Sequence, residues 1–112
     1  MLHDAIGLAD DGPVVLRWPR GTAHHVGEHE VGEGVKARKV RSGDGSVAIL
    51  AIGKLVADAQ KAADQLAANG IDATVWDVRC CAPLDPEMIN DAARHRAVVT
   101  AEDGIQIGRA HV

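Results

Sequence analysis

Two arginines on either side of a Trp-Pro pair are the side chains best suited to bind a charged ligand. They stand in Arg17-Trp18-Pro19-Arg20-Gly21, directly after the apolar run Val14-Val15-Leu16. A guanidinium can hold a phosphate through two parallel, charge-assisted hydrogen bonds. Ligands of α/β sheets bind beyond the carboxyl ends of parallel strands. If 14–16 is a buried strand, Arg20 is placed to contact a phosphate, and we expect a mainly structural role for Arg17.

A second group of potential ligands lies between Gly21 and Gly34. It contains His24, His25 and His29 together with Glu28 and Glu30. Imidazole and carboxylate groups suit zinc or nickel. The stretch has no period of a helix or strand, however, and a flexible linker does not pre-organise metal ligands. We expect a linker here and no metal site.

The remaining reactive or charged groups favour plain structural roles. Cys80 and Cys81 are adjacent and have no second pair with which to build a disulfide framework or a zinc site. Arg79 beside them could make a thiol reactive, but no nearby histidine offers a base, so we expect inert thiols in a reducing cytoplasm. The basic side chains of 36–41 alternate along an expected edge strand, where charge discourages pairing with another sheet. Anion binding by this run (Lys36, Arg38, Lys39, Arg41) is the alternative.

Length and composition limit the architecture that positions these residues. The chain has 112 residues, enough for one small domain, and contains no Phe or Tyr, so its core must be aliphatic. Its net charge of −4 and scarcity of aromatic rings argue against a nucleic-acid surface. No segment approaches the ~20 apolar residues that cross a bilayer, and 1–10 does not read as a signal peptide. We therefore expect a soluble cytoplasmic protein.

The hydrophobic pattern predicts alternating strands and helices from residue 42 onward. An apolar run at 47–52 indicates a strand buried on both faces, as in a parallel sheet. Helical spacing follows from Leu55 to Leu66 and ends near Asn69-Gly70. A strand at 74–78, a short helix from Pro86 to about Ala93 with Asp85 as its N-cap, and a third core strand at 97–101 complete the pattern. This β-α-β-α-β order predicts an open, mostly parallel α/β sheet.

Four stretches, in this order, resemble the deoxyxylulose-phosphate synthase branch of the transketolase superfamily. They are Arg17-Trp18-Pro19-Arg20-Gly21, residues 47–53 with the following helix, Asp77-Val78-Arg79 leading to Pro83-Leu84-Asp85-Pro86, and Val98-Val99-Thr100-Ala101-Glu102-Asp103. Together they cover nearly the whole chain. The Pro-Leu-Asp segment also occurs in beta subunits of 2-oxo-acid dehydrogenases, so the Arg-aromatic-Pro-Arg-Gly segment decides for the synthase branch.

The resemblance implies a truncated C-terminal domain with a piece of its neighbour. Residues 1–21 would end a pyrimidine-binding domain, 22–41 would form a linker and entry strand, and 42–112 would form an incomplete transketolase C-terminal domain. The family joins pyruvate to D-glyceraldehyde 3-phosphate with loss of CO2, using thiamine diphosphate and Mg²⁺, and makes a precursor of isoprenoids, thiamine and pyridoxal. The resemblance assigns Arg20 to the phosphate of glyceraldehyde 3-phosphate. The family's catalytic, cofactor and metal residues lie upstream, so we expect none here.

Some positions depart from the family pattern or imitate it. Ala82 stands where a lysine is common, and the tail 107–112 differs from the usual glycine-rich turn and helix. Gly43-Asp44-Gly45 imitates the start of the thiamine-diphosphate motif, but it precedes a strand and Asn69 follows too soon, so we expect a β-turn. Glu102 and Asp103 resemble an acidic pair at the catalytic face, although a solvated loop explains them equally well.

Three functions fit these observations. The first is a fragment of the synthase, inactive alone, whose parent is a homodimer that acts on small molecules. The second is a non-catalytic dimerisation or regulatory module with the same fold, and the third is a fragment of a 2-oxo-acid dehydrogenase beta subunit. In each case we expect the isolated chain to be marginally stable and prone to associate, because sheet edge and apolar helix surface would be uncovered.

Overall fold

The computed structural model describes residues 2–18, 20–22, 27 and 31–104. The first two elements are the helix α1 (Leu2–Leu8) and the short 3-10 helix η1 (Ala9–Asp11). The others, in chain order, are β1 (Arg38–Arg41), β2 (Val47–Ala51), α2 (Leu55–Ala68), β3 (Thr74–Asp77), α3 (Pro86–Ala92) and β4 (Ala97–Ala101). Across these ranges, no helix has both the length and the apolar character required to cross a membrane.

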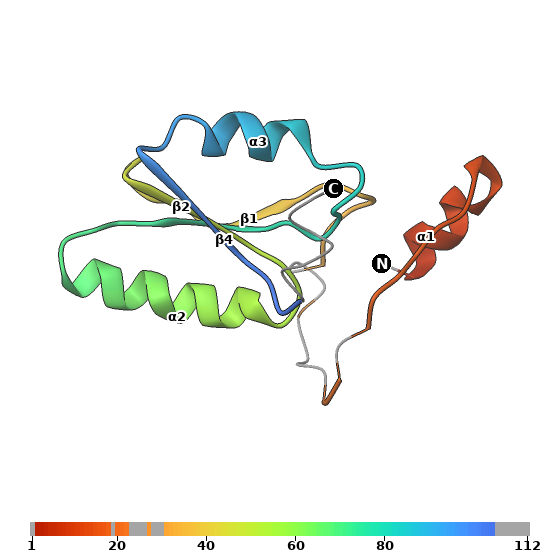
Figure 1. The fold of residues 1–112 in the computed structure, drawn as a ribbon, viewed down its shortest axis with the longest axis horizontal. Helices are drawn as coiled ribbons and strands as arrows, with labels where there is room; N and C mark the ends of the chain where they lie inside the picture. Colours follow the sequence, from red (N-terminus) through yellow and green to blue (C-terminus); the bar gives the residue numbers. More distant parts are fainter. Residues whose placement is uncertain (1, 19, 23–26, 28–30, 105–112) are drawn as a thin grey trace.

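The four strands form one open sheet in the order β1-β3-β2-β4. The central strand β2 runs parallel to both of its neighbours, and Ile49 is in register with Val75 of β3 and with Val99 of β4. The edge strand β1 is antiparallel to β3. Figure 1 shows α2 covering one face of the sheet and α3 covering the other. The predicted open, mostly parallel α/β sheet is confirmed.

The core lies in two thin layers, one on each face of the sheet. Successive side chains of a strand point to opposite faces, so β2 supplies both layers. The layer under α3 contains Ala48, Leu50, Trp76, Val78, Met88 and Ala92. The layer under α2 contains Ile49, Ala51, Ala59, Ala63, Ala73 and Val75. Aliphatic residues and one Trp therefore fill the core, as the absence of Phe and Tyr requires.

Helix α2 begins and ends where its sequence predicts. Its buried side chains Ala59 and Ala63 are four residues apart and so share one face. At its end the Ile71 N–H donates to the Leu66 carbonyl at 2.9 Å and the Gly70 N–H donates to Ala67 at 3.0 Å. Gly70 has a φ of 83°, which side chains disfavour and glycine tolerates. This pair of bonds is the Schellman motif, which satisfies the last carbonyls of a helix.

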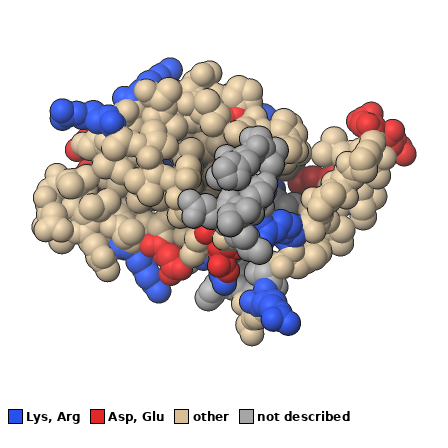
Figure 2. Space-filling view, in the orientation of Figure 1, with Lys and Arg blue, Asp and Glu red and all other residues tan. Residues whose placement is uncertain are grey.

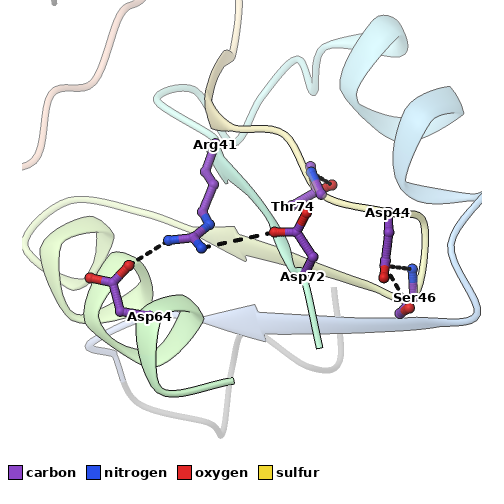
Figure 3. Close-up of polar contacts among 7 residues, drawn as sticks. Arg41, Asp44, Ser46, Asp64, Asp72 and Thr74 are labelled. Atoms are coloured by element: carbon purple, nitrogen blue, oxygen red, sulfur yellow. Dashed lines mark hydrogen bonds and ion pairs between the residues drawn. The ribbon is translucent and has the colours of Figure 1, made fainter. Parts of the chain in front are cut away.

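Polar contacts hold β1 against the rest of the sheet. The Arg41 guanidinium forms ion pairs with Asp64 of α2 and, at 3.8 Å, with Asp72 in the loop before β3 (Figure 3). Just after β1, the Gly43 N–H donates to the buried hydroxyl of Thr74 at 2.9 Å. The predicted edge strand of basic residues is thus confirmed.

The expectation that 97–101 is a core strand is wrong. Strand β4 pairs only with β2 among the described strands and forms the second edge of the sheet. Its first four residues are exposed, with Val98 at 47% and Val99 at 50%. The apolar pattern predicted the strand but could not say that no other described strand pairs with its outer side.

The expectation of a buried strand at 14–16 is also wrong. The run is irregular, and Val15 is 86% exposed. A strand needs a partner for its backbone groups, and no described strand pairs with this run. The chain before it forms α1 and η1 instead, which were not foreseen, and α1 buries only Ala5. The division into 1–21, 22–41 and 42–112 stays a prediction.

Candidate functional site

Charged side chains collect where the three parallel strands end. The parallel strands β2, β3 and β4 end at Ala51, Asp77 and Ala101, so their carboxyl ends lie at the same end of the sheet. Lys54 follows β2, Arg79 follows β3 and Asp103 follows β4. Ligands of open α/β sheets bind at the carboxyl ends of the strands, so this end of the sheet is the candidate functional site.

One ion pair joins the loops after β2 and β4. The Lys54 ammonium contacts the Asp103 carboxylate, and both side chains are well exposed. The hydrogen bond and the charge of Lys54, assisted by the charge of Arg17, hold the pKa of Asp103 below its usual range. The positive charge of Arg17 therefore acts on Asp103, just after the carboxyl end of β4.

Arg20 lies three residues further along the same segment. Its side chain is exposed, and it makes no hydrogen bond or ion pair with any other described residue. The backbone bends at 20–21, where Gly21 has a φ of 112°. Its predicted contact with a phosphate stays a prediction.

Arg79 ties the segment before β1 to the end of β3. Its Nη1 donates to the backbone carbonyls of Lys36 at 2.7 Å and of Glu33 and Gly34 at 3.2 Å. A Cβ at Gly32 would collide with this side chain, so glycine allows the close approach. Sequence reasoning missed this role, because the three carbonyls belong to a segment more than 40 residues away.

The pKa of Asp77, at the end of β3, is shifted upward, whereas those of Asp44 and Asp103 are shifted downward. Burial raises the pKa of this carboxyl, and the hydrogen bond from the Arg79 N–H, together with the charges of Arg79 and Arg38, offsets part of that rise. The Arg79 N–H lies 3.2 Å from Asp77 Oδ1. Of the two thiols that follow, Cys80 is half-buried and Cys81 is exposed. The Arg79 guanidinium is directed to backbone carbonyls.

The aspartate of the Pro-Leu-Asp segment has a structural position. Asp85 Oδ1 accepts from the Glu87 N–H at 2.9 Å and caps α3, as predicted. Its other oxygen, Oδ2, accepts from the Ala37 N–H at 2.9 Å. One buried carboxylate therefore fixes both the start of α3 and the approach to β1.

The Gly-Asp-Gly triplet lies in the loop between β1 and β2, at the opposite end of the sheet. Asp44 Oδ1 accepts from the Ser46 hydroxyl at 2.6 Å and from the Ser46 N–H at 2.9 Å (Figure 3). The Ser46 hydroxyl bond is the main cause that lowers the pKa of Asp44. Gly45 has a φ of 90°. The backbone bends at Gly45 and Ser46, and the β-turn itself stays a prediction. The Asp44 carboxylate is bound by Ser46, just before β2.

The five candidate metal ligands of the linker, where we expected no metal site, all lie outside the described residues. His24, His25, Glu28, His29 and Glu30 are in the ranges that are not described. In the described parts of the chain, no group of three or more His, Cys, Asp or Glu side chains is placed to hold a metal ion. Figure 2 shows Lys and Arg side chains scattered over the visible face rather than gathered in one patch.

Comparison with known proteins gives a family match and similar sequences. Residues 35–110 match the family described as transketolase, C-terminal domain. The chain is similar to the 1-deoxy-D-xylulose-5-phosphate synthase of Anaeromyxobacter dehalogenans, with 42% identity over 114 aligned residues that cover 96% of this chain and 18% of that protein. The enzyme of the same name from Rhodobacter capsulatus is 41% identical over 102 residues, which cover 88% of this chain and 16% of that protein.

A solved structure has the same fold. It is titled "Split gene transketolase, inactive beta4 tetramer" and superposes with a TM-score of 0.69 at 35% identity, covering 80% of this chain and 30% of that one. This chain spans less than a fifth of the length of the curated relatives it matches. Because the family match covers most of the chain and the sheet has the corresponding fold, the protein belongs to the transketolase C-terminal domain family.

Proposed function

We propose that this chain is the C-terminal-domain segment of a 1-deoxy-D-xylulose-5-phosphate synthase. Such an enzyme condenses pyruvate and D-glyceraldehyde 3-phosphate to 1-deoxy-D-xylulose 5-phosphate and CO2, with thiamine diphosphate and Mg²⁺. The observation that carries the proposal is 42% identity to an enzyme of that name across 96% of the chain. The parent enzyme would be a cytoplasmic homodimer that acts on small molecules and binds neither nucleic acid nor membrane.

Arg20 is the residue of this chain that we assign to substrate. Its exposed guanidinium has no partner among the described residues, so its donors are available to a ligand. The neighbouring Arg17 acts on Asp103 at the carboxyl ends of the strands, which supports a place for this segment near the substrate crevice. We infer that Arg20 binds the phosphate of glyceraldehyde 3-phosphate.

The described residues do not fit a site for the cofactor or its metal. The carboxylate of the Gly-Asp-Gly triplet is engaged by Ser46, and the described part of the chain offers no cluster of three metal ligands. In this proposal those groups come from the rest of the parent enzyme. The chain alone is therefore expected to be inactive, and calorimetric titration with thiamine diphosphate and Mg²⁺ should show no micromolar binding.

A chimeric synthase tests the assignment of Arg20. The chain would replace the segment with which it aligns in the Rhodobacter capsulatus enzyme, and steady-state rates would be measured with each substrate varied in turn. Charged hydrogen bonds are worth about 1.5–3 kcal/mol, so Arg20→Ala should raise the KM for glyceraldehyde 3-phosphate by roughly one to two decades. The KM for pyruvate, which carries no phosphate, should change much less.

Two further variants sharpen this test. Arg20→Lys should recover only part of the loss, because an ammonium keeps the charge but not the planar fork. Arg94→Ala removes another exposed arginine, just after α3, and should leave both KM values unchanged. Equal damage to both substrates by Arg20→Ala would show a structural role. An inactive chimera with native-like folding would count against the synthase assignment itself.

The non-catalytic module is the second candidate, and one observation favours it. The similar solved structure is named as an inactive tetramer of a split-gene transketolase chain. If this chain also associates with copies of itself and has no catalytic activity, it would be such a non-catalytic module. Both relatives reported above carry the synthase name, which favours the synthase over a 2-oxo-acid dehydrogenase beta subunit.

A further inference from the structure

His95 joins two segments of the chain through both nitrogens of its ring. It lies half-buried in the loop 93–96, between α3 and β4. Its Nδ1 is 2.9 Å from the Asp91 carbonyl oxygen, and its Nε2 is 2.9 Å from the hydroxyl oxygen of Thr74, the first residue of β3. Thr74 is buried. The ring therefore connects the end of α3 to the start of β3.

These two partners decide which nitrogen of the neutral ring carries the hydrogen. A carbonyl oxygen can only accept, so Nδ1 carries the hydrogen and donates to Asp91. Nε2 then has a free lone pair and accepts from the Thr74 hydroxyl. The hydroxyl oxygen in turn accepts from the Gly43 N–H at 2.9 Å. Hydrogen bonds thus run in one direction from Gly43 through Thr74 and His95 to Asp91.

Protonation of the ring is incompatible with this series of hydrogen bonds. A charged imidazole carries hydrogen on both nitrogens and cannot accept. If Nε2–H donated to Thr74, the hydroxyl proton would lose its acceptor, because Thr74 Oγ1 has no partner among the described residues other than Gly43 and His95. A buried hydroxyl without an acceptor is costly. The half-buried ring can instead leave Thr74 and bond to water.

The loop 93–96 is the side of this contact that can move. On the other side, a Cβ at Gly43 would lie 2.1 Å from the Asp72 carbonyl oxygen, so the backbone there is closely packed. The loop 93–96 is mostly exposed, and its Arg96 N–H donates to the Gly45 carbonyl at 3.1 Å. Release of the neighbouring ring from Thr74 should therefore weaken the Arg96 bond.

We propose that His95 is a pH-sensitive latch at the amino end of the sheet. The neutral ring holds the loop 93–96 to the start of β3, and protonation releases the ring from Thr74 and loosens the loop. Histidine is the side chain whose charge ordinarily changes between about pH 5 and 8. The latch consists of contacts within the described chain, and it does not depend on the proposed enzymatic function.

Charges of both signs surround the ring. The Asp91 carboxylate of α3 interacts with His95, and Lys39 of β1 is paired with the same carboxylate. Arg94 and Arg96 flank His95 in the chain. The other carboxylates of the loops at this end of the sheet are already bound, Asp44 by Ser46 and Asp72 by Arg41 (Figure 3). Because these charges oppose one another, the hydrogen bond to Thr74 decides whether the ring stays in place.

NMR spectroscopy of the whole 112-residue chain tests the latch. Spectra would be recorded between about pH 8 and 5.5, where histidine titrates and Asp91, whose pKa is lowered, stays charged. The ring ¹⁵N shifts should place the hydrogen of the neutral form on Nδ1. As the ring is protonated, the Gly43 amide resonance should move, and the hydrogen-exchange protection of the Arg96 amide should fall by about three- to tenfold, the equivalent of one hydrogen bond.

Three comparisons separate the latch from a general loss of structure. The amide of Leu50 in the central strand β2 should keep its protection throughout. His95→Gln cannot titrate, so Arg96 should be equally protected at both ends of the pH range. His3→Gln removes an exposed histidine of α1 and should leave the response intact.

Four results would each overturn the proposal. They are a neutral ring with its hydrogen on Nε2, constant Arg96 protection while the ring titrates, a response that persists in His95→Gln, and an equal loss of protection at Leu50. Three of these are measured on the wild type, so the test stands even if His95→Gln does not fold. None of these results bears on Arg20.

Discussion

The two edges of the sheet are built in opposite ways. At β1, basic side chains reach inward to acidic partners, with Arg41 contacting α2 and Lys39 contacting Asp91 of α3 at 3.2 Å. The register of β1 also shifts between Lys39 and Arg41. At β4 the strand is regular, uncharged and exposed on both faces. Charges and irregular register are devices that block edge pairing, and among the described strands β1 has them and β4 does not.

The contrast teaches that the charge pattern of a strand has more than one use. The basic residues of β1 discourage pairing, and they also cross-link the strand to both helices. The charges around β4 lie beyond the two ends of the strand and leave its own five residues uncharged. Three substitutions, in order of expected effect, test how firmly β1 is held.

The largest effect is expected for Asp85→Ala. This change removes the N-cap of α3 and the acceptor of the Ala37 N–H. The two hydrogen bonds by which Asp85 connects the start of α3 to the segment before β1 are then both lost. A cap contributes about 0.5–2 kcal/mol and a hydrogen bond to a charged group about 1.5–3 kcal/mol. We expect the free energy of unfolding in urea to fall by about 2–4 kcal/mol. Glu87→Ala, two residues along the same helix, should cost much less; equal losses would show that the link is unimportant.

A smaller effect is expected for Asp91→Ala. The Trp76 Nε1–H donates to Asp91 at 2.8 Å, and Lys39 pairs with the same carboxylate while lying 5.3 Å from the centre of the Trp76 ring. Removing the acceptor leaves the indole N–H without this partner, at a cost of about 1–3 kcal/mol. Asn90→Ala, on the same helix, is the matched control. If Asn90→Ala costs as much, the effect belongs to helix propensity and not to the link with β1.

The cost of Asp91→Ala should also depend on pH. Partial burial alone would raise the pKa of Asp91, but the hydrogen bonds from Trp76 and Lys39 lower it overall. A lowered folded-state pKa stabilises the fold above the unfolded value of about 3.9, and this contribution is lost as the pH falls through the folded value. The difference between wild type and variant should therefore be full at neutral pH and shrink below about pH 4. A constant difference would contradict the charged interaction.

The smallest effect is expected for Arg41→Ala. Its partners Asp64 and Asp72 are 73% and 55% exposed, so water screens both ion pairs. Exposed pairs contribute about 0–1 kcal/mol, and we expect a loss in that range which decreases as salt is added. Urea unfolding at low and high ionic strength would measure it. A loss well above this range, unchanged by salt, would mean that Arg41 acts through packing rather than charge.

Elements with a strong local signal could be predicted from the sequence. The apolar run at 47–51, the helix that ends at Asn69-Gly70 and the Asp85-Pro86 helix start all follow from contacts between residues close in the chain. The resemblance to the transketolase family rests on motifs of the same local kind, and the family match bears it out.

The expectations that failed concern partners that are distant in the sequence. Residues 14–16 have the composition of a strand, but no described strand pairs with them. The apolar residues of β4 predicted a strand correctly, yet the same pattern suits a central strand and an open edge. Hydrophobicity reports which residues favour burial, and not which neighbours the fold supplies.

The sequence by itself determined the order of strands and helices after residue 36, the mostly parallel α/β class and the family. Only the tertiary structure decided that β4 is exposed, that Arg79 holds the carbonyls of 33–36, and that Asp85 also binds the Ala37 N–H. The physical reason is range. Helix periodicity and caps act within a few residues. Strand pairing and these polar contacts join segments more than 20 residues apart, whose meeting depends on the packing of the whole domain.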